Sequence, residues 1–334
     1  MEKFTKRLAL TSGVLALGLA VLAPSKSADR VAIDPMFTYG ETLTDSQFEE
    51  TKSLLGVEDG TEEIEVQVSE LNDLLQDSYP YSQVYSSAYI TAADNDGGVT
   101  VEIATPDTIT SITEAQYENA AITAGAIDVN IKVASAVEVD GSGALAGVYK
   151  AFESAGQTLD ADAREVAQDE LAVTSSITEE NQDTEGYSDA DLNAAIADIK
   201  SEVASLKDEN GGSISVDEIT VIVNNVINNY NLDGVISQEN IQAIIDQMQN
   251  FSALELTEEQ KTQLSNLASS LTDAASTAAS NVAETASSAI ANTDTEQLKE
   301  DSLGIWDRIL SIVDNIFGTS FSSSSDATSE STAE

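Results

Sequence analysis

The sequence predicts an α+β fold, in which an N-terminal mixed sheet with helices precedes an extended all-helical region and a disordered tail. Apolar and polar residues alternate in several short runs before residue 135, which is typical of half-buried strands. Beyond residue 188, apolar residues recur every three or four positions, as on one face of a helix. The end of the chain, 318–334, is rich in Ser and acidic residues and is expected to be disordered.

The composition excludes several classes of function. The 334 residues include 14 Lys and Arg against 59 Asp and Glu, which gives a formal net charge of −45. A phosphate backbone requires a basic surface, so we expect no nucleic acid partner. The absence of Cys excludes disulfides, thiolate nucleophiles and iron–sulfur clusters, and the absence of His excludes a Ser-His-Asp triad. Catalysis would have to use carboxylates, Lys, Tyr or Ser.

The first residues, 1–27, have the order of a secretory signal peptide. Basic residues precede the apolar run 8–23, and small residues follow it, with Ser25 and Ser27 at −3 and −1 of a cleavage site after Ser27. The alternative is an uncleaved anchor, for which the run is short. No later apolar stretch reaches the roughly 18 residues of a membrane span. We therefore expect a secreted, extracellular protein with no transmembrane span in its mature chain.

Residues 29–175 are predicted to form the α+β domain. Two capping boxes, Thr44 with Gln47 and Thr113 with Gln116, begin helices. Other helices are expected at 69–76 and 144–154. Alternating apolar residues predict strands at 64–68, 85–91, 99–104 and 129–133. The predicted order is thus α, β, α, β, β, α, β, α, and the turn-forming cluster 94–98 predicts a hairpin between the second and third strands.

Polar residues 176–188 are predicted to form a linker, and 189–317 a helical region. The first helix of that region has a heptad-like apolar seam, formed by Leu192, Ile196, Ile199, Val203 and Leu206. The last predicted helix, 302–317, is strongly amphipathic but net negative, so docking onto other helices is favoured over a membrane surface.

Four segments occur together in the order that they have in a known family. They are Glu41–Phe48, Gln116–Gly125, Asp128–Ser135 and Gly143–Phe152. With them the chain resembles the DUF1002 family, exported proteins of unknown function from Gram-positive bacteria. The resemblance covers roughly residues 30–175, with a weaker likeness near 190–250. It implies export and a shared fold, and it supplies no catalytic residues.

Three candidate ligand sites follow from local patterns. If residues 81–89 form a strand, Tyr81, Tyr85 and Tyr89 share one face, where exposed rings could stack on sugars or stem peptides of a cell wall. The alternative is ordinary sheet packing, since Tyr favours strands. The run Gly141-x-Gly143-x-x-Ala146 resembles a dinucleotide fingerprint, but Asp140 beside it would repel phosphate, and a tight turn is favoured.

The third candidate is an EF-hand-like loop, residues 229–240. Its oxygen ligands would come from Asn229, Asn231, Asp233 and Ser237. Position 12 is Asn240 instead of the Glu that gives two oxygens to Ca²⁺, so weak calcium binding is the most that the pattern predicts, and a helix–turn–helix is the alternative. No other cofactor is expected.

These observations favour a secreted, non-enzymatic protein of the cell envelope, which binds a cell-wall polymer or, through its helical region, a protein partner. The alternatives are a carboxylate-based hydrolase of cell-wall polymers and a weakly calcium-responsive module.

Overall fold

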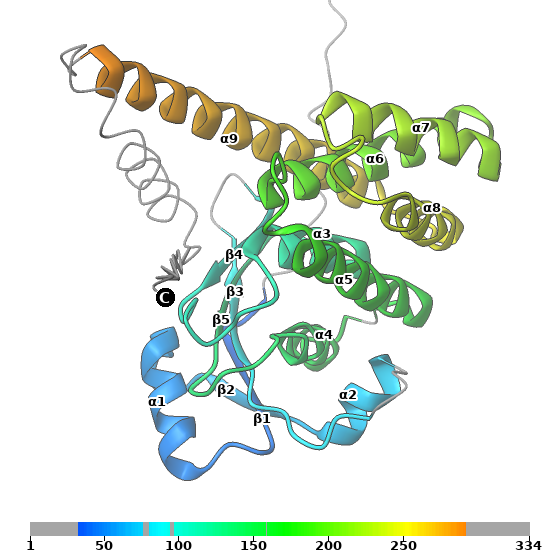
Figure 1. Ribbon diagram of the computed structural model, residues 1–334. Coiled ribbons are helices and arrows are strands. Elements are labelled where there is room, and N and C mark those ends of the chain that lie inside the picture. The colour runs from blue at the N-terminus through cyan, green and yellow to red at the C-terminus, as the bar shows by residue number, and fades with distance from the viewer. Residues whose placement is uncertain (1–32, 76–79, 94–96, 158, 292–334) are drawn as a thin grey trace, which may run out of the picture. The chain divides into compact units, whose positions relative to one another are not determined.

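The computed structural model describes residues 33–75, 80–93, 97–157 and 159–291 (Figure 1). The strands are β1 (Met36–Gly40), β2 (Glu62–Val66), β3 (Ser87–Ala92), β4 (Val99–Ile103) and β5 (Val129–Ala134). The helices of the first half are α1 (Asp45–Leu55), α2 (Val68–Leu75), α3 (Glu114–Ala124) and α4 (Gly143–Ser154). They are followed by α5 (Ala161–Asn181), α6 (Asp189–Glu209), α7 (Val216–Asn229), α8 (Gln238–Ala253) and α9 (Glu258–Ala291).

The α+β class is confirmed, and so is the order of elements from α1 to α4. Both capping boxes are present, and the helices that they begin end at Gly56 and Gly125, each with a positive φ. Strand β1 was not predicted from the sequence. Its residues are almost all buried, so it lacks the alternation of apolar and polar residues that marks a half-buried strand.

The five strands form one sheet in the order β2-β1-β3-β5-β4. Strand β5 lies between β3 and β4, pairing antiparallel with the first and parallel with the second. The predicted hairpin between β3 and β4 is therefore wrong. The apolar side chains of Val129, Ile131 and Val133 place β5 inside the sheet, where both of its edges are paired and these side chains are buried.

The two faces of the sheet are covered by different helices. Residues Ala88 and Ile90 of β3 point toward the large core that includes α3 and α4, whereas Tyr89 between them points toward α1. Under α1, Phe37 and Tyr89 pack with Leu55 in a second, smaller cluster. Figure 1 shows α1 and α4 on opposite faces of the sheet.

Both edges of the sheet are capped by side chains. At the β4 edge, the backbone N–H groups of Val101 and Ile103 donate to the carboxylates of Glu118 (3.1 Å) and Glu114 (2.9 Å) on α3. At the β2 edge, Nζ of Lys150 donates to the carbonyl oxygen of Glu65 at 2.6 Å. These contacts occupy backbone groups that would otherwise be open to pairing with another strand.

The helical region shares its core with the sheet domain. One buried cluster runs from Ile33 to Ala268 and includes residues of α3, α5, α6, α7, α8 and α9. The predicted seam of α6 is buried from Leu192 to Val203. The predicted linker 176–188 is partly helical instead, because α5 continues to Asn181 and buries Ile177. Among the described residues, no helix is long and apolar enough to span a bilayer.

Candidate ligand-binding cleft

A cleft of about 370 Å³ lies where α2, α4 and α5 meet the end of β2. Its small and apolar lining comes from Val66, Ala146 and Ala161, and the ring of Tyr149 also borders it. The remaining lining residues are charged: Glu70, Asp73, Lys150, Glu153, Arg164 and Glu165. The volume falls within the range of small-molecule sites in proteins.

Both cations of the cleft are paired. Nζ of Lys150 lies 2.6 Å from Oε1 of Glu70, and Nη1 of Arg164 lies 2.7 Å from Oε1 of Glu153. Each cation of the cleft therefore holds one of its carboxylates in an ion pair. The exposed carboxylates of Asp73 and Glu165 have no ion pair or hydrogen bond with the described residues.

Two hydrogen-bond donors at this cleft have no acceptor among the described residues. They are Nε of Arg164 and the hydroxyl group of Tyr149, a residue that is 1% exposed. Burial, and then the charge of Glu170, raises the pKa of Tyr149 well above its ordinary value, so its hydroxyl stays protonated and remains a donor. A buried donor without a partner is costly, and a ligand oxygen would satisfy it.

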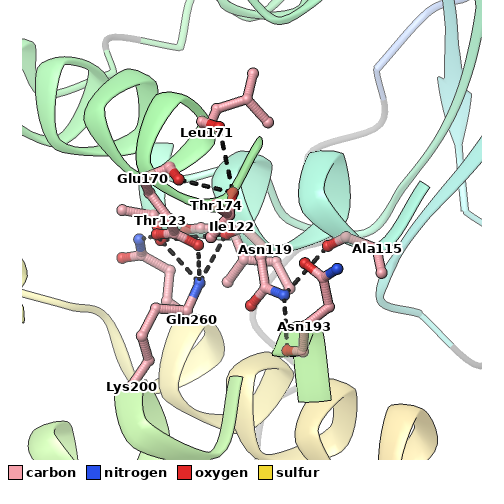
Figure 2. A network of polar contacts seen from close by, with 10 residues as sticks. All are labelled: Ala115, Asn119, Ile122, Thr123, Glu170, Leu171, Thr174, Asn193, Lys200 and Gln260. Atoms are coloured by element: carbon pink, nitrogen blue, oxygen red, sulfur yellow. Dashed lines mark hydrogen bonds and ion pairs between the residues drawn. The ribbon is translucent and has the colours of Figure 1, made fainter. Parts of the chain in front are cut away.

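A buried polar network joins four helices, of which α5 also lines the cleft (Figure 2). Nζ of Lys200 on α6 donates to Oε1 of Glu170 on α5 (2.7 Å), to the carbonyl oxygen of Asn119 on α3 (2.9 Å) and to Oγ1 of Thr123 (3.1 Å). Gln260 of α9 adds a bond from Nε2 to the carbonyl oxygen of Ile122 (3.1 Å). All three donors of the ammonium group have acceptors, so the network holds α5, which also lines the cleft, against α3 and α6.

The predicted row of exposed tyrosines is not formed. Tyr89 lies on β3 beneath α1 and is 7% exposed, whereas Tyr81 and Tyr85 precede the strand. Tyr81 packs beside Val84, and its hydroxyl donates to Oδ2 of Asp140 at 3.3 Å. The prediction failed because the strand begins only at Ser87, and because α1 covers the face on which Tyr89 lies.

The EF-hand-like loop joins α7 to α8, as the sequence predicts, but two of its oxygen-bearing side chains have other partners. Oγ of Ser237 accepts from the N–H of Asn240, and Oδ1 of Asn240 accepts from the N–H of Ser237. Asn240 also contacts Asn181 and Glu180 of α5. Among the described residues, no group of three or more acidic side chains is arranged to hold a metal ion.

The glycine-rich turn before α4 carries its own carboxylate. Oδ1 of Asp140 accepts from the N–H of Ser142 at 3.0 Å, so an acidic side chain occupies the position that a phosphate would take. Gly141 has a φ of +106°, and its carbonyl oxygen accepts from Tyr117 at 2.7 Å. This geometry agrees with a tight turn.

Sequence reasoning did not identify the cleft. None of Tyr149, Arg164 and Glu165 belongs to a motif that predicts a site. The one available signal was scarcity, because a basic residue is rare in this chain. The signal peptide 1–27, the amphipathic helix 302–317 and the tail 318–334 lie outside the described residues.

Comparisons with known proteins extend the resemblance into the helical region. The profile of DUF1002, described as a protein of unknown function, matches residues 39–271. The chain is 29% identical over 246 residues to the uncharacterized protein YpuA of Bacillus subtilis (strain 168), which covers 71% of this chain and 80% of YpuA. No solved structure matches. Because the family profile spans the sheet, the cleft and the helices up to Leu271, the chain belongs to the DUF1002 family.

Proposed function

We propose that this protein is exported and binds a ligand of the cell envelope without catalysing its breakdown, and that the cleft between α2, α4 and α5 is the binding site. The observation that carries the proposal is the cleft itself: its two cations are held by carboxylates, while two buried donors lack acceptors in the part of the chain that the structure describes. Such a site offers hydrogen-bond donors and charged groups to a ligand.

The order of residues 1–27 supports export, and the −45 charge supports solubility in an extracellular setting. The described carboxyl whose pKa is raised to about 7 belongs to Glu118 of α3. It accepts from the backbone of β4 and does not line the cleft. This placement argues against the hydrolase alternative.

The test is a pull-down of the mature chain, residues 28–334, with purified Gram-positive cell wall, followed by mass spectrometry of the soluble fraction. We expect retention without released sugar or peptide. Released fragments would overturn the non-enzymatic proposal. No retention would overturn the proposal that the ligand is a component of the cell wall. The search would then turn to a protein partner of the helical region.

A matched pair of variants locates the site. Arg164→Gln removes a cation of the cleft, and Lys132→Gln removes a cation of the sheet that is paired with Glu102 at 2.9 Å. Retention should fall for Arg164→Gln and stay unchanged for Lys132→Gln. Equal retention in both variants would place the binding surface elsewhere. Export is checked separately by the N-terminal residue of the secreted chain, expected to be Ala28.

A further inference from the structure

The charges that line the cleft select among ligands. Four carboxylates face two cations, so the wall is net negative, and a polyanion such as a polyphosphate would be repelled. Glu165 and Asp73 are exposed and have no ion-pair partner among the described residues, which suits a positively charged group of the ligand.

The two buried donors of the cleft favour a ligand that carries a hydrogen-bond acceptor. Nε of Arg164 and the hydroxyl of Tyr149 have no acceptor among the described residues, and both residues line the same cleft. A carboxylate or carbonyl oxygen of a ligand would meet this requirement.

We infer that the cleft binds a short zwitterionic peptide, with its amino group at Glu165 and Asp73 and a carboxylate or carbonyl oxygen at Arg164 and Tyr149. The inference rests on the proposed function, since it names the ligand class of the same cleft. A peptide combines both charges within a few ångströms, which neither a neutral sugar nor a polyphosphate does. The volume of about 370 Å³ suits a ligand of two or three small residues.

The experiment is isothermal titration of the mature chain with trialanine, its N-acetylated form, its C-terminal amide and an N-acetylglucosamine trisaccharide. We expect a one-to-one isotherm for trialanine and an affinity lower by about tenfold or more for each blocked peptide. We expect no binding of the trisaccharide. Binding of the sugar but not of trialanine, or equal binding of free and blocked peptides, would overturn the inference.

Variants separate a ligand contact from a structural role. Glu165→Gln should weaken trialanine binding several-fold, whereas Glu179→Gln, an exposed carboxylate further along α5, should not change it. Tyr149→Phe should also weaken binding while the protein stays folded by circular dichroism. If Tyr149→Phe and Glu165→Gln both bind as the wild type does, the assigned contacts are wrong.

The outcomes distinguish this inference from the proposed function. Retention on cell wall without affinity for trialanine would leave the envelope-binding proposal standing and reject the peptide. Affinity for trialanine without retention on cell wall would support the peptide as ligand and reject the envelope-binding proposal.

Discussion

Lys200 and Glu170 form an ion pair that is closed off from solvent, with Nζ and Oε1 2.7 Å apart and side chains that are 0% and 2% exposed. Burial lowers the pKa of Lys200, and the neighbouring carboxylate of Glu170 acts in the opposite direction. The pair holds α5 and α6 against α3, and α5 also lines the cleft.

Removing one partner of this pair should be strongly destabilising. Lys200→Met leaves the carboxylate of Glu170 buried without a cation, and we expect the free energy of unfolding to fall by about 3–5 kcal/mol. Lys261→Met is the control, since its pair with Asp208 lies at the surface, where solvent screens the charges, and its loss should cost much less. Urea denaturation measures both, and equal losses would contradict the assigned role.

Replacing both members should cost less than replacing one. In Lys200→Met with Glu170→Met, no charge is left uncompensated, so we expect the double variant to be more stable than Lys200→Met alone. A double variant that is less stable than Lys200→Met would mean that the hydrogen bond from Oγ1 of Thr123 to Oε2 of Glu170 outweighs the cost of the uncompensated charge.

Stability should increase as the pH falls from about 8 to 5. Burial, with a further contribution from Glu114, raises the pKa of Glu118 to about 7 from its ordinary value of 4.5. Between these values the folded state binds more protons than the unfolded state, so lowering the pH favours folding, by at most about 3 kcal/mol. Urea titrations at pH 5.5 and 8.5 test this, and Glu118→Gln should reduce the difference, whereas Glu102→Gln should not.

Gly141 should tolerate no side chain. A Cβ there would lie 2.4 Å from the hydroxyl of Tyr117 and 2.9 Å from Cγ2 of Ile109, at a φ of +106°. Gly156 also has a positive φ, of +79°, but a Cβ there would meet nothing within 4 Å. We expect Gly141→Ala to cost about 2 kcal/mol or more and Gly156→Ala about 1 kcal/mol. Similar losses, measured by thermal unfolding, would show that the turn adapts.

The loop between α7 and α8 should give no calcium response of its own. The protein is strongly acidic, so millimolar Ca²⁺ is expected to raise the melting temperature through general charge screening. Because Ser237 and Asn240 bond to each other, and Asn240 also bonds to Asn181 of α5, we expect the same rise in Asp233→Asn as in the wild type. A smaller rise in Asp233→Asn would restore the calcium hypothesis.

Local signals in the sequence predicted much of the fold. Thr44 and Thr113 mark helix starts because a cap is a short-range hydrogen bond, and Gly56 and Gly125 mark ends because few residues adopt a left-handed conformation. The position of β5 between β3 and β4 depends on long-range pairing, for which residues 94–98 carry no signal. The same holds for Lys200, whose burial depends on acceptors from two other helices.

The cleft was harder to predict than the elements that form it. Arg164 and Glu153 are 11 positions apart on different helices, and Lys150 reaches Glu70 across 80 positions. Polar composition suggested a linker at 176–188, yet Ile177 and Asn181 are buried in the end of α5. In both places the tertiary structure determines which charged or polar residues are paired or buried. No local sequence pattern indicates these contacts.

The capping of β4 by α3 has a geometric consequence. Four helix residues advance about 6 Å and two strand residues about 6.6 Å. The spacing of Glu114 and Glu118 along α3 therefore matches the spacing of Ile103 and Val101 along β4. A slide of α3 by one residue would break both bonds together. The next residue of that helix after Glu118 is Asn119, whose carbonyl oxygen accepts from Lys200. The bonds between α3 and β4 therefore also fix the position of an acceptor for the buried ammonium group.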